Sequence, residues 1–128
     1  MKLLLDTHVL LWWLDDSPRL PHQMRELIAD PEQTVFISTA TVWEIRIKQS
    51  LGKLDLPTDF DAALDASDFN WLGISRLHAD ATAHLPFHHR DPFDRMLIAQ
   101  AQCESLILLT VDERMAVYGK NVLCIKAS

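Results

Sequence analysis

In the stretch Lys2-Leu3-Leu4-Leu5-Asp6-Thr7-His8 a predicted strand gives way to a predicted helix at Asp6. The rest of the chain is organised around this position. The leucines at 3–5 show no polar alternation, which predicts a strand buried on both faces of a parallel sheet. Residues 7–14 then have helical character, with Asp6 or Thr7 as the N-cap. A carboxylate where a buried strand becomes a helix is either a helix cap or part of a site.

The composition is that of a soluble globular protein, and residues 1–128 are expected to form one domain. Hydrophobic residues make up 48% and charged residues 23%. No apolar run reaches the roughly 18 residues that span a bilayer, and no signal peptide is apparent, so we expect a cytoplasmic protein without a membrane segment. Cys103 and Cys124 lie in apolar stretches and fit buried free thiols of a reducing compartment.

The net charge of −6 argues against a protein that binds nucleic acid by electrostatic attraction alone. It does not exclude nucleic acid, because a divalent metal bound by clustered carboxylates reverses the local sign of charge.

Helical stretches alternate with short apolar strands along the whole chain. Strands are predicted at 2–5, 35–37, 71–74, 106–110 and 122–125, and helices at 7–14, 21–29, 39–51, 57–66, 76–84, 92–103 and 112–117. This alternation predicts an α/β fold with a mainly parallel sheet of about five short strands between helices.

Acidic residues occur where parallel strands end or where the next helix begins. Asp6 follows the first strand, Glu44 lies near the second turn of the helix after the second, and Asp112 follows the fourth. Asp91 and Asp94 open the helix that precedes the fourth strand. Sites in open parallel sheets form at the carboxyl ends of the strands, so these acids could meet at one edge.

Converging carboxylates raise each other's pKa, and a hard divalent cation such as Mg²⁺ or Mn²⁺ is the usual compensation. A metal held in this way suits phosphodiester hydrolysis. Each acid also has a structural explanation: Asp6, Asp91 and Asp112 could be helix caps, Asp94 a capping-box partner, and Glu44 half of a surface pair with Lys48.

The sequence segments that contain these acidic residues resemble those of the PIN-domain ribonucleases, and within that family those of the VapC toxins of type II toxin–antitoxin pairs. The matching pieces are residues 3–8, 38–44, 90–101 and 108–112, in the order of the family. The most specific is Arg90-Asp91-Pro92-Phe93-Asp94-Arg95-Met96-Leu97-Ile98-Ala99-Gln100-Ala101.

The resemblance implies a three-layer α/β/α sandwich and an endoribonuclease that uses a water activated by one or two Mg²⁺ or Mn²⁺ ions. It assigns the acidic quartet to Asp6, Glu44, Asp94 and Asp112, with Asp91 as the substitute for Asp94. Thr110 would support the site through a hydrogen bond. It also implies a VapB-type antitoxin, bound in a groove beside the site, and a homodimer.

Basic and aromatic residues lie near the acids in sequence. Arg46, Arg90 and Arg95, together with Lys48 and Arg114, are candidates for contacts with RNA phosphates. Trp12 and Trp13 are adjacent on one predicted helix and cannot both face one core, so either one of them lies near a surface or both are partly buried. His88 and His89 are adjacent in a loop, which does not favour a zinc site.

Two other functions fit a small α/β chain. A receiver-like phosphorelay domain also has an aspartate after its first strand and a threonine after a later one, but it needs an acidic pair that is missing here. A non-catalytic α/β module that binds RNA or protein would be expected to lack some of the acids.

Overall fold

Five short strands pair in parallel into one sheet in the computed structural model, which describes residues 1–126. The strands are β1 (Lys2–Leu5), β2 (Thr34–Ser38), β3 (Asn70–Leu72), β4 (Ile107–Thr110) and β5 (Val122–Cys124). Their order across the sheet is β3-β2-β1-β4-β5. The predicted α/β class with a parallel sheet of about five strands is therefore confirmed.

The strand order decides against a receiver-like fold. The doubly wound order of receiver domains is 2-1-3-4-5, whereas this sheet is ordered 3-2-1-4-5. In this order the chain first builds outward from β1 to β3 and then returns to the other side of β1. The point of reversal lies between β1 and β4, and in open α/β sheets this is where ligands bind.

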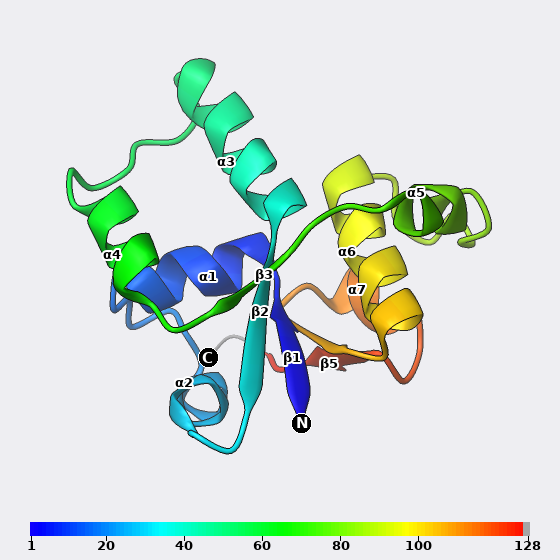
Figure 1. The fold of residues 1–128 in the computed structure, drawn as a ribbon, viewed down its shortest axis with the longest axis horizontal. Coiled ribbons are helices and arrows are strands. Elements are labelled where there is room, and N and C mark those ends of the chain that lie inside the picture. Colours follow the sequence, from blue (N-terminus) through cyan, green and yellow to red (C-terminus); the bar gives the residue numbers. More distant parts are fainter. Residues whose placement is uncertain (127–128) are drawn as a thin grey trace.

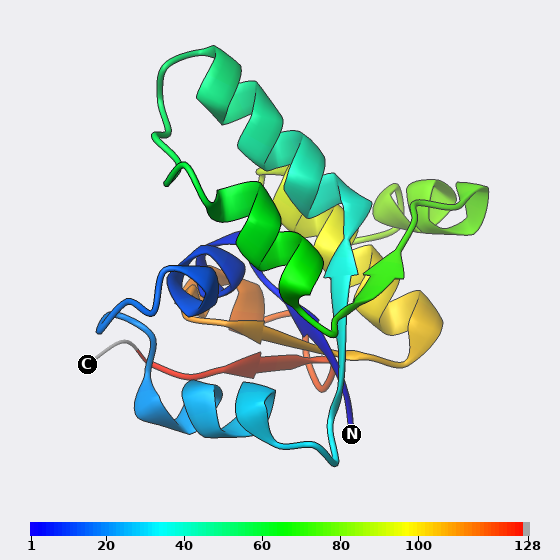
Figure 2. The same cartoon turned by 60° about the vertical axis from the view of Figure 1, so that its left-hand side comes forward.

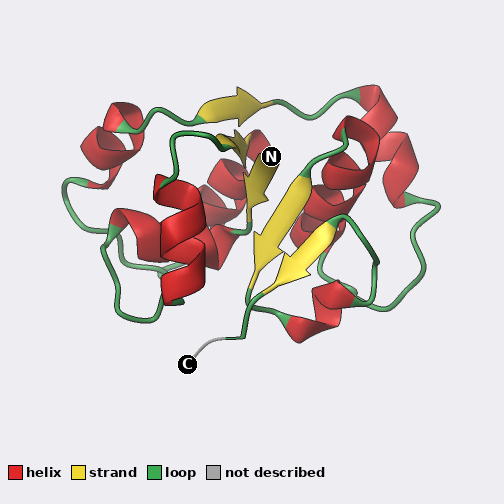
Figure 3. Cartoon of the chain, turned by 90° about the horizontal axis from the view of Figure 1, so that it is seen from below, coloured by secondary structure: helices red, strands yellow, loops and turns green. Residues whose placement is uncertain are grey.

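Helices cover both faces of the sheet (Figures 1 and 3). Their bounds are α1 (Thr7–Leu14), α2 (His22–Ala29), α3 (Thr39–Ser50), α4 (Phe60–Ala66), α5 (Arg76–Thr82), α6 (Pro92–Glu104) and α7 (Glu113–Ala116). The helices α1, α2 and α4 lie on one side of the central strands, and α5, α6 and α7 lie on the other (Figure 1). The predicted three-layer sandwich is confirmed.

The unbroken leucine run of β1 fills two separate cores. Leu3 and Leu5 belong to the core formed with α1, α2 and α4, while Leu4 points into the core formed with α6 and α7. All three leucines are fully buried. Successive side chains of a strand point to opposite faces, so a strand covered on both faces needs apolar residues at every position.

At one edge of the sheet, polar N-cap residues begin the helices that directly follow the strands. Asp6 caps α1, and Ser38 accepts a hydrogen bond from the Ala40 amide at the start of α3. Asp112 caps α7, which follows β4. Figure 2 shows β1 (dark blue) and β2 (cyan) running directly into α1 and α3 at this edge. The caps bring the first turns of these helices to the carboxyl ends of the strands.

The structure differs from the predicted elements mainly in their ends. The helix predicted at 57–66 begins at Phe60, because a turn closed by the Phe60 amide and the Pro57 carbonyl precedes it. The strand predicted at 71–74 ends at Leu72, and the last helix covers only Glu113–Ala116. Gly52, with a positive φ of 69°, follows α3 as expected of a helix stop.

Trp12 and Trp13 are both half-buried and pack against the core on the α1 side of the sheet. The second of the two arrangements considered for them is therefore the one present. Among residues 1–126, no helix is long and apolar enough to cross a lipid bilayer.

Candidate functional site

Five acidic residues line one pocket at the carboxyl edge of the sheet. Its volume is about 720 Å³. The pocket is lined by Asp6, Thr7, His8, Glu44, Lys48, His88, His89, Arg90, Asp91, Asp94, Val111, Asp112 and Arg114. The acids come from the ends of β1 and β4 and from the first two turns of α3 and α6, so the sheet topology brings together positions far apart in sequence.

Asp6 lies at the floor of this pocket, where β1 ends next to β4. One carboxylate oxygen accepts a 2.7 Å hydrogen bond from the Thr7 amide, and the other accepts a 2.7 Å bond from the Thr110 hydroxyl. The Asp6 amide donates to the Leu109 carbonyl at 3.0 Å. Burial raises the pKa of Asp6, although these two hydrogen bonds oppose the change. Asp6 is therefore both a helix cap and a buried acid of the pocket.

Glu44 enters the pocket from the second turn of α3 and is buried, not the surface residue that its pairing with Lys48 suggested. The Thr7 hydroxyl donates a 2.7 Å hydrogen bond to Oε1 of Glu44. Lys48 Nζ lies 2.5 Å from Oε2, and this bond raises the pKa of Lys48. Both carboxylate oxygens of Glu44 are thereby oriented by neighbours.

Asp94 and Asp112 approach each other across the buried ring of His89. Nε2 of His89 lies 3.0 Å from Oδ2 of Asp94 and 3.3 Å from Oδ2 of Asp112. One potential ligand atom from each of the three residues lies within 4.8 Å of the other two, and no other such group occurs in the described chain. Asp6 and Glu44 line the same pocket but lie outside this tight group.

The pKa of Asp94 is raised to about 8. Burial is the main cause, followed by the negative charges of Asp6, Asp91, Glu44 and Asp112. The pKa of Asp112 is instead lowered to about 2, mainly because Arg114 donates two hydrogen bonds of 3.0 and 2.9 Å to its carboxylate. The Lys and Arg side chains of this pocket lie at its rim, and within residues 1–126 none of them forms an ion pair with Asp94.

Asp91 and Asp94 have different tasks at the start of α6. Oδ1 of Asp91 accepts hydrogen bonds from the amides of Phe93 and Asp94, which makes Asp91 the predicted N-cap. The capping-box alternative for Asp94 is wrong, because its carboxylate faces His89. Asp94 is therefore the acid of α6 that is free for the pocket, while Asp91 lines the pocket edge.

Arg95 is buried, with 8% of its surface exposed, and the structure corrects its predicted contact with RNA phosphates. Its two terminal nitrogens donate to the carbonyls of Thr82, Leu85, Pro86 and His89. No terminal N–H remains for a phosphate, and the guanidinium is stacked on the Phe87 ring at 4.3 Å.

Arg46 lies outside the acidic pocket, where it pairs with Asp61 of α4. Arg90 is exposed at the rim of the pocket, together with Lys48 and Arg114.

Two residues of the site were missed or discounted from the sequence. Thr7 orients Glu44 through its hydroxyl, which no spacing rule indicates because 37 residues separate the two. For His89 the sequence offers only an adjacent histidine pair in a loop, which does not favour a zinc site. Its actual partners are two acids, one of them beyond β4, and only the tertiary structure brings them together.

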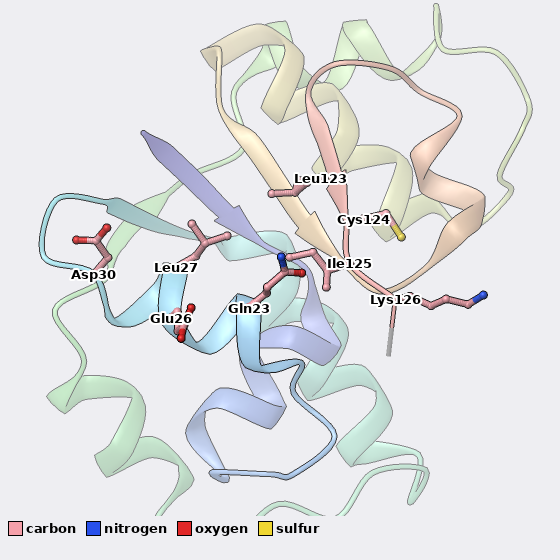
Figure 4. A pocket seen from close by; sticks show the side chains of 8 residues that line it. All are labelled: Gln23, Glu26, Leu27, Asp30, Leu123, Cys124, Ile125 and Lys126. Carbon is pink, nitrogen blue, oxygen red and sulfur yellow. The ribbon is translucent and has the colours of Figure 1, made fainter. Parts of the chain in front are cut away.

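A second cavity, of about 630 Å³, lies on another part of the surface (Figure 4). It is formed by α2 and by β5 with the residues that follow it. Its carboxylates are Glu26 of α2 and Asp30 directly after α2, and no acid from another element lines the cavity with them, so it does not resemble a metal centre.

The chain belongs to the PIN domain family, whose model matches residues 3–121. The match includes all five acids of the pocket. A search of curated proteins found no sequence match.

Solved structures share the fold. The VapBC2 complex of Rickettsia felis, bound to a DNA fragment from its promoter, matches with a TM-score of 0.73 and 14% identity over 100% of both chains. A toxin–antitoxin complex from Klebsiella pneumoniae matches with a TM-score of 0.64 and 20% identity over 94% of both chains. The FitAcB structure from Neisseria gonorrhoeae matches with a TM-score of 0.62 and 22% identity over 91% of both chains.

Proposed function

We propose that this protein is a VapC-type toxin, an endoribonuclease that depends on Mg²⁺ or Mn²⁺ and hydrolyses RNA phosphodiester bonds. The observation that carries this proposal is the gathering of acids from separate elements in one pocket. Asp6, Glu44, Asp94 and Asp112 converge there, and the pKa of Asp94 rises to about 8 because the carboxyl group is buried and lies near the negative charges of the other acids. PIN-domain membership and the toxin–antitoxin structures that share the fold give independent support.

The donor set fits a hard divalent cation. Five of the groups that line the pocket are carboxylates, and oxygen ligands are those that Mg²⁺ and Mn²⁺ prefer. Asp94 and Asp112 would hold one ion, and Asp6 and Glu44 would complete the site directly or through water. When bound, such an ion lowers the pKa of water and stabilises negative charge on phosphate oxygens.

The chain's own side chains would position these acids and the substrate. Thr110 and Thr7 fix the carboxylates of Asp6 and Glu44 through their 2.7 Å hydrogen bonds. Arg90 has no hydrogen bond or ion pair within the described residues and lies at the pocket rim, so it is free to contact an RNA phosphate. Lys48 and Arg114 use only part of their N–H groups on Glu44 and Asp112, so each also has donors for a phosphate.

The experiment that tests this function is RNA cleavage by the purified chain in Mg²⁺, in Mn²⁺ and in EDTA. We expect cleavage only with metal, and a loss of more than about 100-fold in Asp6→Asn, because losing even an outer-shell partner costs about 10–100-fold. Asp65→Asn is the matched control, since Asp65 is an exposed acid of α4. Wild type that binds RNA with metal but leaves it intact would favour the non-catalytic binding module.

We further propose that a VapB-type antitoxin binds beside the acidic pocket. An apolar groove of about 380 Å³ adjoins the pocket and shares Arg90 with it. The Trp43 side chain in this groove is exposed and packs edge-on against Phe93 at 5.4 Å. Co-expression with a candidate VapB-type antitoxin should give a complex that Trp43→Ala weakens. Light scattering of the free protein would test the expected homodimer.

A further inference from the structure

His89 is a buried histidine between two acids, and the acidic quartet assigned above gives it no role. Only 6% of its surface is exposed. Its Nε2 atom lies within hydrogen-bond distance of Oδ2 of both Asp94 and Asp112, at 3.0 and 3.3 Å. A histidine in this position could either bind a metal through Nε2 or donate a hydrogen bond from Nε2–H to the two carboxylates.

The other ring nitrogen decides between these roles. The amide of Asp91 donates a hydrogen bond of 3.2 Å to Nδ1 of His89. Nδ1 therefore accepts and carries no proton, so that in the neutral ring the proton is on Nε2. A metal-binding histidine has the opposite arrangement, with the ligating nitrogen unprotonated and the second nitrogen donating to an acceptor. The Asp91 amide thus selects the tautomer that donates toward the acids.

The backbone of His89 is held on both sides by residues outside the pocket. Its amide donates to the Tyr118 hydroxyl at 3.0 Å, and its carbonyl accepts from Arg95 at 3.2 Å. The Tyr118 hydroxyl donates in turn to the Pro86 carbonyl at 2.6 Å, and Arg95 also donates to that carbonyl. These contacts fix the loop between α5 and α6 and explain why Arg95 is buried.

We propose that His89 is a positioning residue whose Nε2–H donates to Asp94 and Asp112 and sets their separation, and that Tyr118 and Arg95 hold His89 in place for this purpose. The proposal rests on the proposed function, because it assigns His89 a part in the same metal site. His89 acts through the two acids and is not a metal ligand.

The first test is the tautomer of His89 in the metal-free wild type, read from long-range ¹H–¹⁵N NMR couplings of the ring. We expect the form protonated at Nε2. A ring protonated at Nδ1 alone would overturn the proposal without any variant being made.

The second test measures Mn²⁺ binding by electron paramagnetic resonance and calorimetry in wild type, His89→Gln, His89→Leu and the control His84→Leu. The amide of Gln can replace the Nε2–H donor, so we expect its Mn²⁺ affinity to stay within about 3-fold of wild type. His89→Leu should lose about 10–100-fold, the usual cost of removing an outer-shell partner. His84 is exposed on the same loop, so His84→Leu should leave the Mn²⁺ affinity unchanged.

Two results would overturn the role of His89. One is an imidazole nitrogen coupling to bound Mn²⁺ that disappears in His89→Gln, which would make His89 a ligand. The other is wild-type Mn²⁺ affinity in a folded His89→Leu. If wild type binds Mn²⁺ and follows this pattern but cuts no RNA, the proposed function fails and the inference stands. A wild type that binds no Mn²⁺ overturns both.

Tyr118→Phe tests the support of the loop. It removes the acceptor for the His89 amide and the donor to Pro86, so we expect a weaker Mn²⁺ affinity with the Nε2–H tautomer less populated. An unchanged tautomer and affinity would show that Tyr118 has no part in positioning His89.

Discussion

The Thr110 hydroxyl donates a 2.7 Å hydrogen bond to Oδ2 of Asp6, and this contact joins the ends of β4 and β1 across 104 residues of sequence. The same hydroxyl accepts a 3.0 Å bond from the Asp112 amide. Thr110 therefore links two of the acids in the pocket.

Replacing Thr110 by Val should leave one oxygen of the buried Asp6 without its donor. We expect a stability loss of about 1–3 kcal/mol, the cost of an unsatisfied buried polar group, and a loss of about 10–100-fold in Mn²⁺ affinity. Thr110→Ser keeps the hydroxyl and should bind Mn²⁺ like wild type. Chemical denaturation and calorimetry measure the two effects, and equal affinities in Val and Ser variants would contradict the role of Thr110.

Asp91→Ser separates the capping task of Asp91 from a possible ligand task. Ser caps helices about as well as Asp, so we expect the free energy of unfolding to change by less than about 0.5 kcal/mol. RNA cleavage should remain within a few-fold of wild type if Asp94 is the third acid. Loss of activity in a folded Asp91→Ser, with activity kept in Asp94→Asn, would exchange the two roles.

The pocket makes the stability of the metal-free protein depend on pH. In the folded state the pKa of Asp94 is about 8, above its ordinary value of 3.8, so folding favours the neutral form. This contribution is fully present below about pH 4 and is lost as the pH rises through about 8. In EDTA, Tm should therefore fall more steeply with pH in wild type than in Asp94→Asn.

The control for this pH series is Asp65→Asn, which should follow wild type. Saturating Mn²⁺ should raise the wild-type Tm most at pH 8, since a bound cation stabilises only the folded state. A pH slope that is the same in wild type and Asp94→Asn would contradict the raised pKa of Asp94.

Arg46 and Arg90 form a matched pair for RNA binding. Arg90 is exposed at the pocket rim, whereas Arg46 pairs with Asp61 outside the pocket. We expect Arg90→Ala to weaken RNA binding several-fold and to reduce its salt dependence, and Arg46→Ala to leave both unchanged. Binding measured at several salt concentrations, in a catalytically inactive Asp6→Asn background, checks this without cleavage.

Local signals predicted the framework of the site well. The leucine run before Asp6 predicted a doubly covered strand, and the order Asp91-Pro92 predicted the start of α6. Both depend on residues close together in sequence, because alternation and capping are properties of a few consecutive positions.

Side-chain assignments were less predictable where a partner comes from another element. Arg95 is next to Asp94 in sequence, yet helical rotation points it away from the pocket and toward four carbonyls of the preceding loop. Neighbours on a helix differ by about 100° in direction, so proximity in sequence to an acid does not predict proximity to the site. The roles of His89 and Thr7 were not predicted either, because their partners also come from distant elements.

The sheet order has a consequence during synthesis of the chain. β1 pairs with β2 on one side, but its other neighbour, β4, lies about a hundred residues later. A nascent chain on the ribosome can therefore pair β1 with β2 through the crossover of α1 and α2 while Asp6 still lacks Thr110 and Asp112. Such a chain holds only part of the acidic pocket, and the proposed metal site is completed only when β4 has emerged and inserted beside β1.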